Sequence, residues 1–362
     1  MRLGLVVYDG LEGTSGGYRY DRRLVAGLRE RGHEVAVVTI PREEYGRNLL
    51  DNVSRAVAAD LAALEVDVLL QDELCHPSLI RHNRRRDDAT PVVAIVHHLR
   101  CQEPRAAWQN VFYRAIEQRY LETVDAFVYN SETTRETVEA LVGPTTGIVA
   151  PPGGDHIDPG VTRTQICARA HEPGPLRIVF VGTLIERKGL HTLLQGLAAR
   201  PADEWTLTVV GDPTVDPEYA RRIDRLIDIL GVRESVTVAG RLPDAALAST
   251  LREGHLLAVP SGYEGFGIVY LEGMGFGLPA LASTAGGASE VVTDGETGVL
   301  VPPDEPLAIA EAVGSLATDR ERLAEMGVAA WDAYDAHPTW SDTVDRVASF
   351  TAALRKPPEP SP

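Results

Sequence analysis

The stretch PSGYEGFGIVYLEGMGFGLP, residues 260–279, carries the densest functional signal in the chain. Glu264 is followed by Gly265-Phe266-Gly267, and Glu272 lies eight positions after Glu264. Glycines let a backbone approach a ligand closely, and a helix that begins near Gly267 would direct its free N–H groups at an anion such as a diphosphate. The two carboxylates would then contact opposite ends of one long ligand. The alternative is a surface turn with two solvated glutamates, and two glutamates alone favour that alternative.

A second stretch, VGTLIERKGL at residues 181–190, follows a predicted strand and opens a helix. Arg187 and Lys188 are expected at the carboxyl end of the strand, facing a solvent-filled cleft, where they can neutralise phosphate oxygens. The ordinary alternative is an exposed Arg-Lys pair. The chain has only two lysines, Lys188 and Lys356, among 35 basic residues, and this favours a specific role for Lys188.

Around these stretches, short apolar runs alternate with helical patterns along most of the chain. This alternation predicts right-handed βαβ units and hence an α/β fold with parallel sheets. The 362 residues suggest two domains. We expect a first domain over 1–160, a linker over 161–175 and a second domain over 176–335, with a helix at about 338–355 packing back on the first domain. The tail 356–362 is rich in proline and is predicted to be disordered.

Open parallel sheets bind ligands beyond the carboxyl ends of their strands. Two such domains facing each other would place one ligand crevice opposite the other, which suits a reaction with two substrates. Fold alone does not establish function, so this expectation depends on the motifs.

Taken together, the motifs closely resemble those of glycosyltransferase family 4, which has the GT-B fold of two facing Rossmann-like domains with an interdomain cleft. That family carries Glu-x7-Glu with Gly-Phe-Gly after the first Glu, as Glu264 and Glu272 do here. The resemblance is strong from about residue 176 to 302 and looser in the first half. Further matching positions are Gly16-Gly17, His97, Gly182, Lys188-Gly189, Gly277-Leu278-Pro279 and Gly286-Gly287.

The resemblance implies a role for each matching position. Lys188 and Arg187 would bind the phosphates of a sugar nucleotide, Glu264 would hold hydroxyls of the transferred sugar, and Glu272 would bind the ribose. His97 would contact the transferring sugar or the acceptor. Where the family often has Arg directly after the glycine of Val-Gly, this chain has Thr183, and Arg187 is expected to supply that charge. Backbone close to the donor would come from Gly16, Gly17, Gly182, Gly265, Phe266, Gly267 and Ile268.

The resemblance therefore implies a retaining glycosyltransferase that moves a sugar from a nucleoside-diphosphate sugar to an acceptor hydroxyl, without a cofactor or a metal. Uridine and guanosine donors both stay open, as do the sugar and the acceptor. Three rival enzyme classes are a glycoside hydrolase that uses Glu264 and Glu272, a sugar-nucleotide epimerase and a phosphorylase. A non-catalytic binding module is a further alternative.

Composition limits the partners and the compartment. The net charge of -17 argues against nucleic acid, whose phosphates would be repelled. Three isolated cysteines and the strand that begins at Arg2 predict a cytoplasmic protein. The one dense basic run is a candidate for weak peripheral contact with anionic lipid at the inner membrane face, although a solvated helix end is the more usual meaning. Its arginines are Arg81, Arg84, Arg85 and Arg86.

Overall fold

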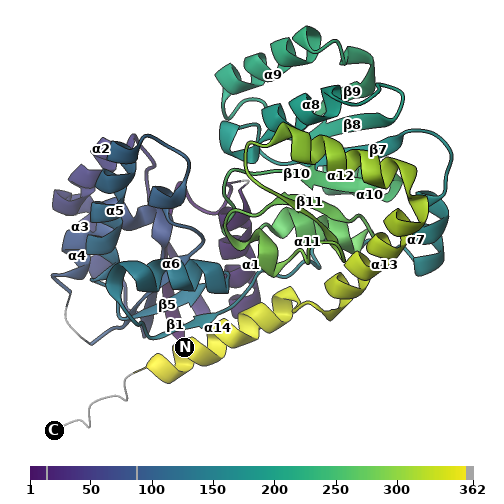
Figure 1. Cartoon of the computed structure of the whole chain (residues 1–362). Helices are drawn as coiled ribbons and strands as arrows, with labels where there is room; N and C mark the ends of the chain where they lie inside the picture. Colours follow the sequence, from purple (N-terminus) through teal and green to yellow (C-terminus); the bar gives the residue numbers. More distant parts are fainter. Residues whose placement is uncertain (14, 87–88, 356–362) are drawn as a thin grey trace, which may run out of the picture. The chain divides into compact units, whose positions relative to one another are not determined.

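The computed structural model describes residues 1–13, 15–86 and 89–355, and its contacts divide the chain into two compact units (Figure 1). The first unit comprises Met1–Gly153 and the chain from Pro338 onward, and the second comprises Gly154–His337. The division thus falls before the linker expected at 161–175. Thr162 and Gln165 form a capping box that starts helix α7, and this helix packs on α13 within the second unit. The tail 356–362 lies outside the described residues.

The first unit is built on a six-stranded sheet in which every neighbouring pair is parallel. Its strand order is β2-β1-β3-β4-β5-β6. The strands are β1 (Arg2–Tyr8), β2 (Glu34–Ile40), β3 (Val68–Asp72), β4 (Val92–Val96), β5 (Ala126–Tyr129) and β6 (Gly147–Val149). The helices are α1 (Gly16–Glu30), α2 (Tyr45–Asn48), α3 (Arg55–Ala62), α4 (His76–Asn83), α5 (Ala107–Leu121), α6 (Glu132–Val142) and α14 (Trp340–Leu354), with short 3-10 turns η1 (Leu49–Val53), η2 (Glu73–Cys75) and η3 (Arg100–Gln102).

The last helix, α14, returns to the first unit and packs against α1 (Figure 1). Gly27 of α1 makes this approach possible, because a Cβ there would lie 2.7 Å from Val344. The Thr343 hydroxyl donates to the Pro151 carbonyl at 2.6 Å, and Arg31 pairs with Asp345. Helix α14 is separate from α13, since α13 ends at Ala336 and Pro338 interrupts the chain before α14.

The second unit contains the other six-stranded parallel sheet, in the order β12-β11-β10-β7-β8-β9. The strands are β7 (Leu176–Val181), β8 (Trp205–Val210), β9 (Val236–Gly240), β10 (Leu256–Val259), β11 (Ala280–Ser283) and β12 (Gly298–Val301). The helices are α7 (Arg163–Ala170), α8 (Leu190–Ala198), α9 (Pro217–Ile229), α10 (Asp244–Glu253), α11 (Ile268–Gly275), α12 (Pro306–Thr318) and α13 (Arg320–Ala336), with 3-10 turns η4 (Glu186–Lys188), η5 (Arg233–Ser235) and η6 (Gly287–Glu290).

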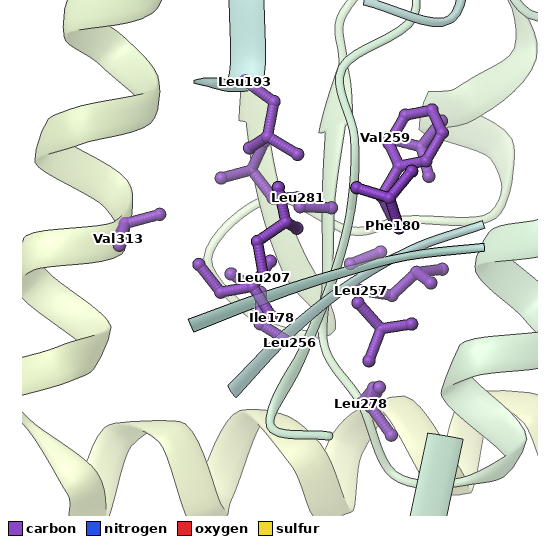
Figure 2. Packing of buried hydrophobic residues seen from close by; sticks show 14 of the residues in the cluster. Ile178, Phe180, Leu193, Leu207, Leu256, Leu257, Val259, Leu278, Leu281 and Val313 are labelled. Atoms are coloured by element: carbon purple, nitrogen blue, oxygen red, sulfur yellow. The ribbon is translucent and has the colours of Figure 1, made fainter. Parts of the chain in front are cut away.

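Apolar strands of the second sheet form the centre of its core (Figure 2). Ile178 and Phe180 of β7 lie beside Leu207 of β8 and Leu257 of β10, and helices contribute Leu193 and Val313. Because helices cover a parallel sheet on both faces, its strands are nearly continuous in hydrophobic residues. This explains why the strands could be recognised in the sequence as short apolar runs.

In each sheet the strand order reverses at one place. The reversal lies between β1 and β3 in the first unit and between β7 and β10 in the second. The carboxyl ends of strands at such a reversal open a crevice where α/β proteins bind ligands. The expected α/β class with two parallel sheets is confirmed, and the reversals show where each unit can hold a ligand.

Candidate functional site

In the second unit, the loops after β7 and β10 bring Lys188, Arg187 and Glu264 together. Lys188 Nζ donates to Glu264 Oε1 and, at 3.1 Å, to Oε2. Arg187 Nη1 donates to Glu264 Oε1 at 3.3 Å and to the Tyr263 carbonyl at 2.6 Å. Three residues that are separated by up to 77 positions in sequence therefore form one charged cluster at the strand reversal.

This cluster is buried more deeply than the sequence suggested. The side chains of Lys188 and Glu264 are only 15% and 7% exposed. Burial lowers the pKa of Lys188, and the charge of Arg187 lowers it further, while the Glu264 carboxylate acts in the opposite direction. Two cationic side chains face one carboxylate, so the cluster has an excess positive charge that suits an anionic ligand.

Glycines make the close approach of these loops possible. Gly189 follows Lys188 with a φ of 71°, and a Cβ there would lie 2.1 Å from the Pro260 carbonyl oxygen. Gly286 has a φ of 82°, and a Cβ there would lie 2.0 Å from the Glu264 carbonyl oxygen. The Gly287 N–H donates to that same oxygen at 2.8 Å. The Gly286-Gly287 pair therefore supports the loop that presents Glu264.

Helix α11 begins where the sequence places it, directly after Gly267. Gly267 has a φ of 90°, which favours glycine, and Ile268 is the first helical residue. The Tyr270 hydroxyl donates to the Val259 carbonyl at 2.7 Å and ties the start of the helix to the end of β10. The first backbone N–H groups of α11 thus lie directly after the loop that contains Gly265. The side chain of Phe266 in that loop is buried.

Glu272 lies inside α11 and is buried, with the His156 ring nitrogen Nε2 3.3 Å from its Oε1. The sequence analysis assigned His156 no role. No local sequence pattern connects positions 156 and 272, so their pairing could not be recognised from the sequence. A ribose contact for Glu272 stays a prediction.

Gly182 lies after β7, and a Cβ there would be in ordinary contact with Lys188 Cδ at 3.7 Å. A Cβ on Gly211, the residue after β8, would lie 2.0 Å from the Gly182 carbonyl oxygen. The Gly182 backbone is thus held against the neighbouring loop, beside the Lys188 side chain.

In the first unit, the glycine loop and His97 also meet. A Cβ on Gly17 would lie 3.0 Å from His97 Cδ2, and Gly16 is the first residue of α1. His97 follows β4 and is 7% exposed. Its Nε2 lies 3.4 Å from Oδ1 of Asp21, a fully buried residue of α1 that sequence reasoning did not select.

The predicted basic run is arranged around the end of α4. Arg81, Arg84 and Arg85 are exposed, whereas Arg86 is half-buried. The Arg81 N–H donates to Asn52 Oδ1 at 2.8 Å, so the run adjoins η1. In the part of the chain that the structure describes, no helix combines the length and the hydrophobicity that crossing a membrane requires.

Within the described ranges, two buried groups of carboxylates and an imidazole have close donor atoms: Asp21, Asp72 and His97, and Glu73, His76 and Glu117. In the second group both ring nitrogens of His76 already have partners, the Tyr45 hydroxyl at 2.8 Å and the Glu73 carbonyl at 2.9 Å. In the first group, a bound proton can offset the negative charge of the two carboxylates. We therefore assign neither group to a metal.

Comparisons with known proteins support the motif-based interpretation. Residues 163–331 match the family model described as Glycosyl transferases group 1. Over 250 residues, the chain is 34% identical to D-inositol 3-phosphate glycosyltransferase of Nocardia farcinica, covering 66% of this chain and 55% of the relative. It is 31% identical over 224 residues to a GDP-mannose-dependent phosphatidylinositol monomannoside mannosyltransferase of Mycolicibacterium smegmatis, covering 57% of this chain and 56% of that protein. The chain thus spans little more than half the length of these curated relatives.

Solved structures show the same fold over nearly the whole chain. Sucrose-phosphate synthase from Thermosynechococcus elongatus has a TM-score of 0.81 at 21% identity, with 98% of each chain covered. The Anabaena protein HepE, crystallised with UDP and glucose, has a TM-score of 0.78 at 19% identity, covering 98% of this chain and all of that one. Residues 163–331 therefore match the glycosyl transferases of group 1, and the chain has the α/β fold of GT-B glycosyltransferase structures.

Proposed function

We propose that this protein is a retaining glycosyltransferase that moves a sugar from a nucleoside-diphosphate sugar to an acceptor hydroxyl. The observation that carries the proposal is the cluster of Lys188, Arg187 and Glu264 at the strand reversal of the second unit. Its cations are suited to the diphosphate, and its carboxylate is suited to the sugar hydroxyls. The match over residues 163–331 supports the same class of reaction.

Catalysis would be mainly electrostatic. Negative charge develops on the diphosphate as it leaves, and fixed cations and N–H groups stabilise such charge without reorganising. Lys188, Arg187 and the amides of Gly265–Ile268 would supply this stabilisation. Because glycine contacts hold both loops, their donors are already in place before the sugar nucleotide binds.

The same contacts argue against a glycoside hydrolase that uses two glutamates. Glu264 is ion-paired with Lys188, and the His156 ring nitrogen Nε2 lies 3.3 Å from Glu272 Oε1. A neighbouring cation favours the ionised carboxylate, so Glu264 is not suited to donate a proton as the acid of such an enzyme. The hydrolase also leaves Arg187 without a function.

The donor base is the main open choice within this proposal. UDP is the nucleotide in the HepE structure, and GDP-mannose is in the name of the mycobacterial relative. A thermal-shift panel of UDP- and GDP-sugars tests the choice, because a true donor at about 100 times its dissociation constant adds about 2.7 kcal/mol of stability. The anomeric configuration of the product, measured by proton NMR, tests retention. A panel in which no sugar nucleotide raises the melting temperature would contradict the proposal.

We also propose a weak peripheral contact with anionic lipid through Arg81, Arg84, Arg85 and Arg86. Leu50 and Val53 of η1 are 66% and 63% exposed, and η1 adjoins this run through Asn52. Vesicle binding should fall steeply with salt, since surface charges are screened within a Debye length. Equal vesicle binding by the wild type and by a variant with Ser at all four arginines would remove this part of the proposal.

A further inference from the structure

Three buried ionisable side chains meet in the first unit, beside its glycine loop. Asp21 comes from α1, Asp72 ends β3, and His97 follows β4. Asp21 and Asp72 are 0% exposed, and His97 is 7% exposed. The elements that carry them converge at the strand reversal between β1 and β3. The cluster therefore lies at the place where this sheet opens its crevice.

The two carboxyl groups lack the hydrogen bonds that buried carboxylates normally have. Among the described residues, neither oxygen of Asp21 has a hydrogen-bond partner. Asp72 accepts one bond, from the Leu74 N–H to Oδ1 at 2.9 Å, and its Oδ2 has none. A buried carboxylate without partners is strongly unfavourable. His97 Nε2, 3.4 Å from Asp21 Oδ1, is the cationic group that meets this charge within the cluster.

Residues of α1 contact the His97 ring at Nε2, at Cδ2 and on an edge. Its Nε2 faces Asp21, and Gly17 packs so closely on Cδ2 that a Cβ there would lie at 3.0 Å. The Tyr20 ring contacts the imidazole edge-on with the centroids 5.2 Å apart. Nε2 is buried without a hydrogen bond, whereas the side chain as a whole is 8% exposed.

We propose that Asp21 is a positioning residue, which holds the imidazole of His97 through Nε2 and so leaves Nδ1 to face a ligand. The inference rests on the proposed function, in which His97 contacts the transferring sugar or the acceptor. Asp72 completes the arrangement from the carboxyl end of the neighbouring strand β3. Asp21 itself touches no substrate; it acts through His97.

The electrostatics of the cluster agree with this geometry. Burial lowers the pKa of His97, but the interaction with Asp21 and the charges of both carboxyl groups outweigh burial, and the net shift is upward. Burial and the neighbouring Asp21 raise the pKa of Asp72 to about 7. The raised pKa extends the pH range in which His97 is an imidazolium, a form in which both ring N–H groups donate. Nε2–H faces Asp21, and Nδ1–H can donate to a ligand oxygen.

The other titratable neighbours do not supply a competing charge. Burial raises the pKa of Tyr18, of Tyr20 and of Cys75, so all three stay neutral near pH 7. Arg42 acts on Tyr18 and Cys75 and is the further cation on this side. Burial also raises the pKa of Glu73, which interacts with Asp72, so the experiment follows the His97 ring signal itself.

Proton NMR of the full chain, without any sugar nucleotide, tests the hold of Asp21 on His97. The His97 ring signal is identified from its loss in His97→Gln. We expect the ring to titrate above the ordinary value of about 6.5 in the wild type and about one unit or more lower in Asp21→Asn. Asn has nearly the size of Asp, so packing is preserved. Glu30→Gln removes an exposed charge from the same helix and should leave the titration unchanged.

Kinetics then test whether the positioning serves the reaction. The wild-type kcat/KM should fall as pH rises through the pKa of His97, because the imidazolium donor is lost. In Asp21→Asn this fall should move to lower pH, while Glu30→Gln keeps the wild-type profile. An unchanged ring titration in Asp21→Asn overturns the inference, and so does a shifted titration with an unmoved pH profile.

Two further outcomes have separate meanings. If no sugar nucleotide binds or is turned over, the proposed function fails, and the NMR titration still decides whether Asp21 holds His97. A stoichiometric divalent ion found in the purified wild type and lost in Asp21→Asn would also overturn the inference, because an ion rather than a proton would then balance the carboxylates.

Discussion

Replacing Lys188 with Ala tests the candidate phosphate site most directly. The change removes the Nζ that contacts both oxygens of Glu264 and that would meet the departing diphosphate. Loss of one fixed electrostatic stabiliser lowers kcat by on the order of 10²–10³. We expect a loss of that size in Lys188→Ala, with a smaller change in KM, because the contact strengthens as the phosphate leaves.

The structure also predicts a cost in stability, which the sequence did not. A lysine facing solvent would add little to the fold, but the Lys188 side chain is only 15% exposed and pairs with a buried carboxylate. Its removal leaves Glu264 with Arg187 Nη1 at 3.3 Å as a remaining cationic partner. Because one partner remains, we expect a loss of about 1–3 kcal/mol in the free energy of unfolding, less than for a fully orphaned buried charge.

Initial rates and urea unfolding measure the two effects separately. Lys188→Met keeps most of the side-chain volume and removes the charge, so it separates packing from electrostatics. Arg222→Ala is a matched control: it breaks an exposed ion pair with Glu186, two residues before Lys188, and should change stability by less than about 1 kcal/mol and kcat hardly at all. A fully active Lys188→Ala would refute the assignment of the phosphate site.

Further predictions concern other residues of the second unit and the dependence of turnover on metal ions. Glu264→Gln should lower turnover, since an amide is a poorer acceptor for sugar hydroxyls than a carboxylate, and mass spectrometry should find no covalent sugar adduct; an adduct on Glu264 would indicate double displacement. Gly231→Ala should cost about 1–2 kcal/mol through its φ of 69° alone, whereas Gly189→Ala adds a clash with the Pro260 carbonyl and should cost clearly more in urea unfolding; equal costs would contradict the clash. His156→Ala should weaken donor binding in calorimetry by removing the partner of Glu272, and unchanged affinity would count against a ribose contact. Turnover should survive EDTA, and complete loss restored by magnesium would contradict metal independence.

Much of the second unit could be predicted from sequence because its signals are local. Gly267 and the helix after it are adjacent in the chain, so the start of α11 followed from the residues themselves. The strands were recognisable as short apolar runs, whereas their pairing, such as that of β11 with β12, is decided by the tertiary structure. By contacts, the two units divide at Gly153 and Gly154, before the predicted linker at 161–175, because α7 packs within the second unit.

Pairings between distant residues could not be predicted in the same way. No periodicity links Glu272 to His156 or His97 to Asp21, because these contacts depend on which strand ends lie side by side. Asp21 looks like an ordinary polar residue in an Arg-rich helix, and its complete burial is visible only once β3 and β4 are in place beside α1.

The sequence by itself determined the α/β class, the two sets of strands and the residue types of the donor motifs, because hydrophobic periodicity and glycine spacing act over a few residues. The tertiary structure decided the partners and the burial of the charges. Lys188 is a paired, largely buried cation instead of a solvent-facing one, and His97 is held by Asp21. These properties arise from the strand order, which brings loops from distant parts of the chain to one reversal in each sheet.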